Sequence, residues 1–62
     1  MSNVSRAHKL QEAIALLKDA DNCMQVALGA TDECYELHNA LEDIQTTLEE
    51  YAEQLIEMQI TE

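Results

Sequence analysis

The chain's single glycine, Gly29, separates two arms that follow the same helical pattern in different phases. In residues 7–28, apolar residues recur at alternating spacings of three and four, which is typical of a helix that packs along one stripe. Residues 34–58 repeat this spacing and begin with Cys34. If the spacing of the first arm is continued past Leu28, however, it does not include position 34, so the two patterns are out of register. One uninterrupted helix cannot bury both stripes on the same side, so the pattern predicts a break at Gly29.

The segment LGATDE (28–33) has the chemistry of a turn between two helices. Gly29 suits the left-handed conformation that closes a helix, and Thr31 or Asp32 can cap the next one. We therefore predict an all-α fold with one domain over residues 1–62. It is an antiparallel helical hairpin with a helix over about 4–28, a turn over 29–31 and a helix over about 32–59.

The apolar stripes predict which residues face each other inside the hairpin. The first runs through Ala7, Leu10, Ile14, Leu17, Met24 and Leu28, and the second through Cys34, Leu37, Leu41, Ile44, Leu48, Tyr51, Leu55 and Met58. Asp21 interrupts the first stripe. Two interpretations stay open for Asp21. Either it lies near the edge of a bundle and reaches water, Asn22 or a neighbouring helix, or it sets the register between two copies of the chain.

A chain of 62 residues needs support beyond one hairpin. A domain of this length buries only ~60% of the surface that its unfolded chain exposes, and such small scaffolds usually need a disulfide, a metal or a partner subunit. Both arms also carry apolar or small residues beside their main stripes: Ala13, Leu16, Ala20, Cys23 and Ala27 on the first, and Ala40, Thr47 and Ala52 on the second.

We therefore expect two hairpins to form a homodimeric four-helix bundle. Its predicted core and dimer residues are Leu10, Ala13, Ile14, Leu17, Ala20, Met24, Leu37, Leu41, Ile44, Leu48, Tyr51 and Leu55.

The net charge of −10 is concentrated in the second arm, because the chain has ten acids and no Lys or Arg from Thr31 onward. A phosphate backbone or an anionic membrane would be repelled there, so we expect no direct nucleic-acid or membrane binding. The acids predict a face for a basic protein partner, a mimic of DNA, or a solvated surface that only keeps the bundle soluble. The candidate acidic face is made of Glu36, Glu42, Asp43, Glu49, Glu50, Glu53 and Glu57.

In an antiparallel hairpin, the bases of the first arm should lie level with part of this acidic face. We expect Arg6 and Lys9 beside Glu50 and Glu53, and Lys18 beside Glu42. A second candidate contact surface lies at the open end of the hairpin. This open-end patch is formed by Val4, Ile56 and Ile60, and the alternative is that frayed chain ends fold over these residues.

Cys23, Cys34 and His38 are the residues with chemistry of their own. Cys34 and His38 are one helical turn apart, and Cys23 comes from the facing arm, so the alternatives for these residues are zinc ligation, a Cys23–Cys34 disulfide and buried, reduced thiols. The chain has no CxxC motif, and we favour buried, reduced thiols with no metal or cofactor. No nucleophile stands beside a base and no glycine-rich loop is present, so we expect no enzymatic activity.

The whole chain resembles the small acidic accessory proteins of temperate, lambdoid-type bacteriophages. The resemblance rests on the short length, on the acidic segment LEDIQTTLEEYAEQLIEM (41–58) and on the lack of a catalytic motif. It implies an early-expressed factor in the cytoplasm of an infected bacterium, acting on host regulation or on the choice between lysis and lysogeny. It transfers no functional residue.

The predicted function is therefore a non-enzymatic, regulatory interaction with a host or phage protein. The alternative is an acidic DNA mimic that inhibits a DNA-binding or defence protein. The N-terminus lacks a hydrophobic signal segment and no apolar run approaches ~20 residues, so we expect a cytoplasmic protein.

Overall fold

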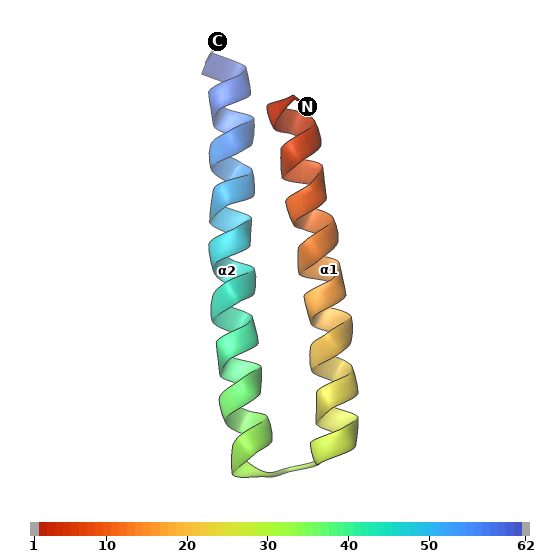
Figure 1. Cartoon of the computed structure of the whole chain (residues 1–62). Helices are drawn as coiled ribbons and strands as arrows, with labels where there is room; N and C mark the ends of the chain where they lie inside the picture. The colour runs from red at the N-terminus through yellow and green to blue at the C-terminus, as the bar shows by residue number, and fades with distance from the viewer. Residues whose placement is uncertain (1, 62) are drawn as a thin grey trace.

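The computed structural model describes residues 2–61, with side chains through Met58, as two antiparallel helices (Figure 1). Helix α1 spans Asn3–Leu28 and helix α2 spans Asp32–Thr61. The predicted all-α helical hairpin is confirmed, and the helix bounds lie within two residues of those expected from the sequence. Both ends of the chain lie at the same end of the hairpin, opposite the turn.

Helix α1 begins and ends with the chemistry that its terminal residues provide. The Ser2 hydroxyl accepts a hydrogen bond from the backbone N–H of Ser5 at 3.1 Å, which caps the first turn. At the other end, Gly29 takes φ 65°, and its N–H donates to the Gln25 carbonyl at 2.9 Å. A residue with a side chain is strained at this positive φ, which is why the glycine is needed here.

Helix α2 begins at the cap that the sequence offered. Of the two candidate caps, Thr31 is the one used, because its hydroxyl accepts a hydrogen bond from the backbone N–H of Cys34 at 3.2 Å. Asp32 and Glu33 then occupy the first turn, where the positive end of the helix dipole favours carboxylates. The turn therefore fixes where α2 starts relative to α1.

The register of the two helices follows from residues that meet across the contact. Asp21 Oδ2 lies 2.7 Å from His38 Nδ1. Moving one heptad away from the turn on both helices places Ile14 level with Gln45, and one heptad further Ala7 is level with Ala52. These four residues are 6%, 9%, 0% and 3% exposed, respectively, so this line is the centre of the contact.

The sequence prediction for the contact face of α2 is partly wrong. The residues of α2 that are buried or half-buried are Cys34, His38, Leu41, Gln45, Leu48, Ala52, Leu55 and Ile56. We call His38, Gln45 and Ala52 the inner column. Leu37, Ile44, Tyr51 and Met58, which we call the outer column, were expected in the seam but are 45%, 48%, 54% and 49% exposed.

The buried Asp21 explains why α2 turns its inner column toward α1, rather than the outer column that the sequence predicted. Asp21 is only 8% exposed, and a buried carboxylate needs hydrogen-bond donors. His38 supplies one only when α2 turns its inner column toward α1. Leu41, Leu48 and Leu55 lie between the two columns and are half-buried, so these leucines pack beside the inner column in the observed orientation.

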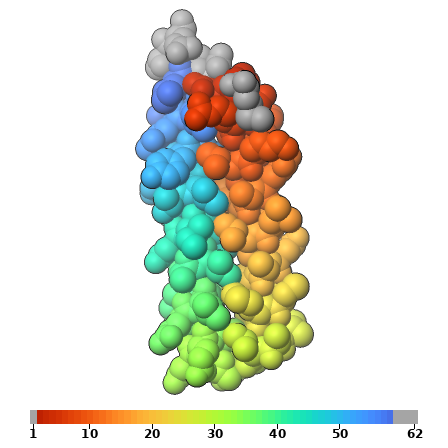
Figure 2. Space-filling view, viewed as in Figure 1, coloured from red at the N-terminus to blue at the C-terminus, as the bar shows by residue number. Residues whose placement is uncertain are grey.

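The hairpin is one helix thick, with extents of 47 × 15 × 11 Å. Figure 2 shows the two helices touching along the length of the described chain. Among the described residues, no large side chain is fully buried, and Ala20 of the predicted core is exposed. Two helices alone therefore do not enclose a core. Within residues 2–61, neither helix combines the length and apolar character of a membrane-crossing segment.

Candidate functional site

The acidic face is presented outward along α2. Its seven predicted members, Glu36, Glu42, Asp43, Glu49, Glu50, Glu53 and Glu57, are all exposed. Glu36, Asp43, Glu50 and Glu57 form one row at heptad spacing on the side turned away from α1. Glu42, Glu49 and Glu53 lie closer to the groove between the helices, so the acids wrap around one side of α2.

The bases of α1 do not neutralise this surface in the way the sequence predicted. Lys9 Nζ binds Glu12 Oε2 of its own helix at 3.2 Å, with both side chains 64% exposed. Among residues 2–58, no ion pair joins Arg6, Lys9 or Lys18 to α2. Lys9 is level with Glu50, but both residues are exposed and lie away from the contact between the helices. The predicted pairs across the hairpin are therefore wrong.

The open-end patch is partly described. Ile56 is half-buried and lines a shallow groove together with Gln11, Ile14, Glu49, Ala52 and Glu53. Val4 is one heptad before Gln11, so it continues the same side of α1 toward the open end, and it is 38% exposed. The side chain of Ile60 lies outside the described residues. Val4 and Ile56 thus share one face, which Glu49 and Glu53 border.

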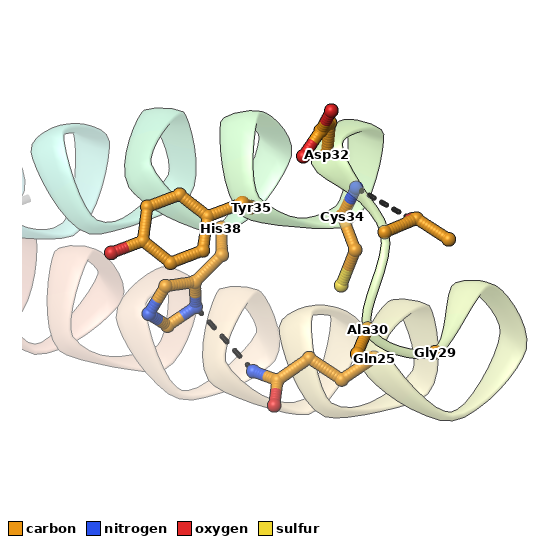
Figure 3. Close-up of a pocket in the computed structure, with 8 residues that line it drawn as sticks. Gln25, Gly29, Ala30, Asp32, Cys34, Tyr35 and His38 are labelled. Carbon is orange, nitrogen blue, oxygen red and sulfur yellow. Dashed lines mark hydrogen bonds between the residues drawn. The ribbon is translucent and has the colours of Figure 1, made fainter.

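A hollow beside the turn holds the residues with the most reactive chemistry (Figure 3). It has a volume of about 670 Å³ and is lined by Gln25, Gly29, Ala30, Thr31, Asp32, Cys34, Tyr35 and His38. The Cys34 side chain points from α2 toward α1 and is buried. Cys23 is exposed, which corrects the expectation that both thiols are buried. Both thiols are free, and the described residues contain no group of three or more potential metal ligands.

His38 lies between two carboxylates. Its Nδ1 is 2.7 Å from Asp21 Oδ2, and its Nε2 is 3.4 Å from Glu42 Oε1. The short distance to Asp21 requires a proton between the two atoms, so Nδ1–H donates to the carboxylate. Gln25 Nε2 donates to the same oxygen at 3.1 Å. The 3.4 Å approach of Gln25 Nε2 to His38 Nδ1 is then a contact of two donors that share one acceptor.

The second oxygen of Asp21 has no partner. Asp21 Oδ1 is buried, and among the described residues that are not exposed it is the one buried side-chain oxygen or nitrogen that makes no hydrogen bond. A hydrogen bond between Asp21 and a neighbouring helix was one of the interpretations left open by the sequence, and in the structure this bond is made with His38 of the same chain. The pairing with His38 was not predicted. The signal that points to it is that the two residues lie level in an antiparallel hairpin closed at Gly29.

This arrangement does not form a catalytic triad. In a triad, the histidine nitrogen opposite the aspartate faces a hydroxyl or thiol that it activates. Here that nitrogen, Nε2, faces the Glu42 carboxylate. Asp21 and His38 therefore serve as a polar contact that fixes how the helices face each other.

No family model, curated protein or solved structure matches this chain.

Proposed function

We propose that this protein is a non-enzymatic regulatory factor that binds a basic protein through the acidic face of α2. The observation that carries this proposal is the outward position of all seven acids of that face on a helix with no Lys or Arg. A surface with one sign of charge over this length attracts a partner of the opposite sign and accelerates its association.

The charge pattern works against the helix that bears it, which supports a role beyond folding. Glu49 and Glu53, and Glu53 and Glu57, are four residues apart on one helix. Like charges at this spacing cost a few tenths of a kcal/mol per pair. A basic partner would relieve this repulsion on binding. Lys9, the base level with Glu50, is engaged with Glu12 instead.

The resemblance to acidic accessory proteins of temperate bacteriophages supplies the biological setting of the proposal. In that setting the protein acts in the cytoplasm of an infected bacterium, and its partner is a host or phage protein whose activity affects phage development. The way His38 is used supports a non-catalytic role, because its two nitrogens face carboxylates rather than a nucleophile.

The second candidate function is mimicry of DNA, and the heptad row of acids along α2, with further acids beside it, favours it. In this case the partner is a DNA-binding or defence protein whose groove accepts the acids in place of phosphates. Acids one heptad apart are about 10.5 Å apart along the helix, a wider spacing than that of successive phosphates. A general basic partner needs no such match of spacing.

Affinity capture from the native host, followed by binding titrations with the captured protein, tests both functions. We expect Glu42→Gln, Asp43→Gln, Glu49→Gln and Glu50→Gln together to weaken binding at least tenfold and to flatten its dependence on salt. The matched control is Glu12→Gln with Asp19→Gln on α1, which should leave the dissociation constant within twofold.

Three outcomes separate the alternatives. Competition by double-stranded DNA for the captured protein supports mimicry. Loss of binding on Ile56→Asp, with the four glutamine substitutions tolerated, assigns binding to the open-end patch instead. Unchanged binding by both variants contradicts the proposal.

A further inference from the structure

One face of the hairpin is apolar across both helices. On α2 it consists of the outer column, Leu37, Ile44, Tyr51 and Met58, with half-buried Leu41, Leu48 and Leu55 beside it. On α1 the equivalent positions are half-buried Leu10, Leu17 and Met24, followed by Ala13, Ala20 and Ala27.

These positions share a face because of the symmetry of an antiparallel pair. A two-fold rotation perpendicular to the plane of the two helices exchanges them and keeps each face of the hairpin on its own side. Ile44 directly precedes Gln45, and Ala13 directly precedes Ile14, so each lies one residue before a residue at the centre of the contact. Ile44 and Ala13 therefore lie on the same face of the hairpin. Gln11 and Glu49 each lie three residues before a residue at the centre of the contact, which places them on the opposite face. The shallow groove that they line is therefore on that face.

The two halves of the apolar face differ in size in a complementary way. The outer column of α2 carries large side chains, whereas α1 presents the alanines 13, 20 and 27 at the equivalent positions. At the outer edges of the apolar face, further from the contact between α1 and α2, the sizes are reversed. There α1 presents Leu16, which is 69% exposed, and α2 presents Ala40 and Thr47. Large side chains pack best against small ones on a facing helix. Each helix is therefore shaped for the other type of helix rather than for its own.

The charges at the borders of the apolar face also favour packing of α1 of one copy on α2 of the other. Arg6 and Lys9 continue the rows of Ala13 and Leu16 on α1 by one heptad. On α2, Glu50 lies just beyond the border row of Thr47, and it is level with Lys9. When α1 of one copy lies over α2 of another, Lys9 approaches Glu50 of that copy. When like helices meet, the acidic border of α2 faces another acidic border, which is unfavourable.

We propose that the apolar face binds a second copy of the chain, with α1 of each copy packed on α2 of the other. The two copies are related by a two-fold axis parallel to the helices, so every neighbouring pair in the resulting four-helix bundle is antiparallel. A face 47 Å long and 15 Å wide gives a footprint on the order of 700 Å², close to the roughly 800 Å² per partner of a stable complex.

This dimer encloses the core that a single hairpin lacks. The outer column becomes interior, and Ala13 and Ala20 of the facing copy lie level with the gaps between Ile44 and its heptad neighbours Tyr51 and Leu37. Leu16 covers the surface between Ala40 and Thr47. The acidic row of Glu36, Asp43, Glu50 and Glu57 stays at the surface. Within this row only Glu50 lies near Lys9 of the facing copy, so dimerisation leaves most of the row accessible to a basic partner.

Sedimentation equilibrium of the full chain tests whether the apolar face mediates association. We expect the wild-type chain to be a dimer at tens of micromolar and Ile44→Glu to raise the dissociation constant at least a hundredfold. Val26→Glu is the matched control, because Val26 is 87% exposed and lies on the far side of α1. This variant should remain a dimer. A monomeric wild type, or a dimeric Ile44→Glu variant, overturns the proposal.

A disulfide experiment tests which helices meet, without depending on a destabilising substitution. In a chain with Cys23→Ser and Cys34→Ala, we introduce Leu16→Cys and Ala40→Cys together, since Leu16 lies closest to Ala40 of the facing copy. Mild oxidation should give a covalent dimer, whereas Leu16→Cys alone should stay monomeric on a denaturing gel. A covalent dimer from Leu16→Cys alone shows that like helices meet and contradicts the arrangement, as does failure of the double variant to cross-link.

Discussion

The inner and outer columns of α2 have the opposite of the burial that their chemistry suggests. The inner column, His38, Gln45 and Ala52, is covered by α1 although two of its three residues are polar. The outer column is about half exposed although its four residues are large and mostly apolar. Maximal apolar burial therefore does not decide how the two helices face each other. The orientation instead goes with a polar contact between Asp21 and His38 near the turn and with the burial of Ala7 and Ala52 near the open end.

The comparison also separates two tasks of the same helix. The inner column holds the hairpin together through Asp21–His38, Ile14–Gln45 and Ala7–Ala52. The outer column contributes little to the hairpin, and it is the column that the proposed second copy covers. Substitutions in the inner column should therefore change the stability of the fold, and those in the outer column should change association.

The largest difference is expected between two isoleucines. Ile14 is 6% exposed and Ile44 is 48% exposed. Ile14→Ala should lower the free energy of unfolding by about 3 kcal/mol at every protein concentration, because it leaves a cavity between the helices. Ile44→Ala should lower it mainly at concentrations where wild-type dimers form, since its side chain packs on the second copy. Urea unfolding followed by circular dichroism over a hundredfold range of concentration measures both effects. Equal losses for the two variants at the lowest concentration would contradict the separation.

The next effect concerns the polar contact of the inner column. His38→Leu removes one donor from the buried Asp21 carboxylate, whose Oδ1 already lacks a partner. We expect a loss of about 2 kcal/mol in the free energy of unfolding, the cost of leaving a buried polar group unsatisfied.

Replacing both partners provides the control for this contact. Asp21→Leu combined with His38→Leu removes the unsatisfied groups and should recover most of the lost stability, as apolar replacements of buried ion pairs often do. The same urea titrations measure it. A double variant that is less stable than either single variant would show that the contact itself, rather than the penalty for breaking it, stabilises the hairpin.

The elements that the sequence predicts well are those with local causes. The helices follow from the spacing of apolar residues, and the turn follows from Gly29 and the cap at Thr31. These signals act over a few residues and do not depend on how α1 and α2 face each other. For the same reason the exposure of the acidic residues on α2 follows from the pattern alone.

The rotation of α2 is the part that the sequence pattern leaves open. Leu41, Leu48 and Leu55 pair equally well with the outer column or with the inner column in a pattern of threes and fours. The choice depends on a contact between Asp21 and His38, which are 17 residues apart. A count of apolar residues favours the outer column, because it gives no weight to the need of a buried carboxylate for donors.

A smaller effect of opposite sign is expected at the centre of the inner column. Gln45 is 9% exposed and faces Ile14. Gln45→Leu keeps the shape of the site and buries an apolar side chain instead of an amide, so it should raise the free energy of unfolding by about 1 kcal/mol. Gln54→Leu at an exposed position of the same helix is the control and should change it little. A loss of stability in Gln45→Leu would show that the amide makes a contact that the hairpin needs.

The smallest effect is expected among the acids that border the inner column. Glu53 is four residues from both Glu49 and Glu57, so Glu53→Gln removes two like-charge pairs and should raise the free energy of unfolding by a few tenths of a kcal/mol. The gain should vanish in high salt, which screens exposed charges. Glu33→Gln is the matched control and should lower the free energy of unfolding, because Glu33 lies in the first turn of α2, where a negative charge is favourable. Thermal unfolding at low and high salt measures both variants. If Glu53→Gln lowers stability at low salt, repulsion among the acids does not strain α2, and relief of that repulsion cannot contribute to the binding of a basic partner.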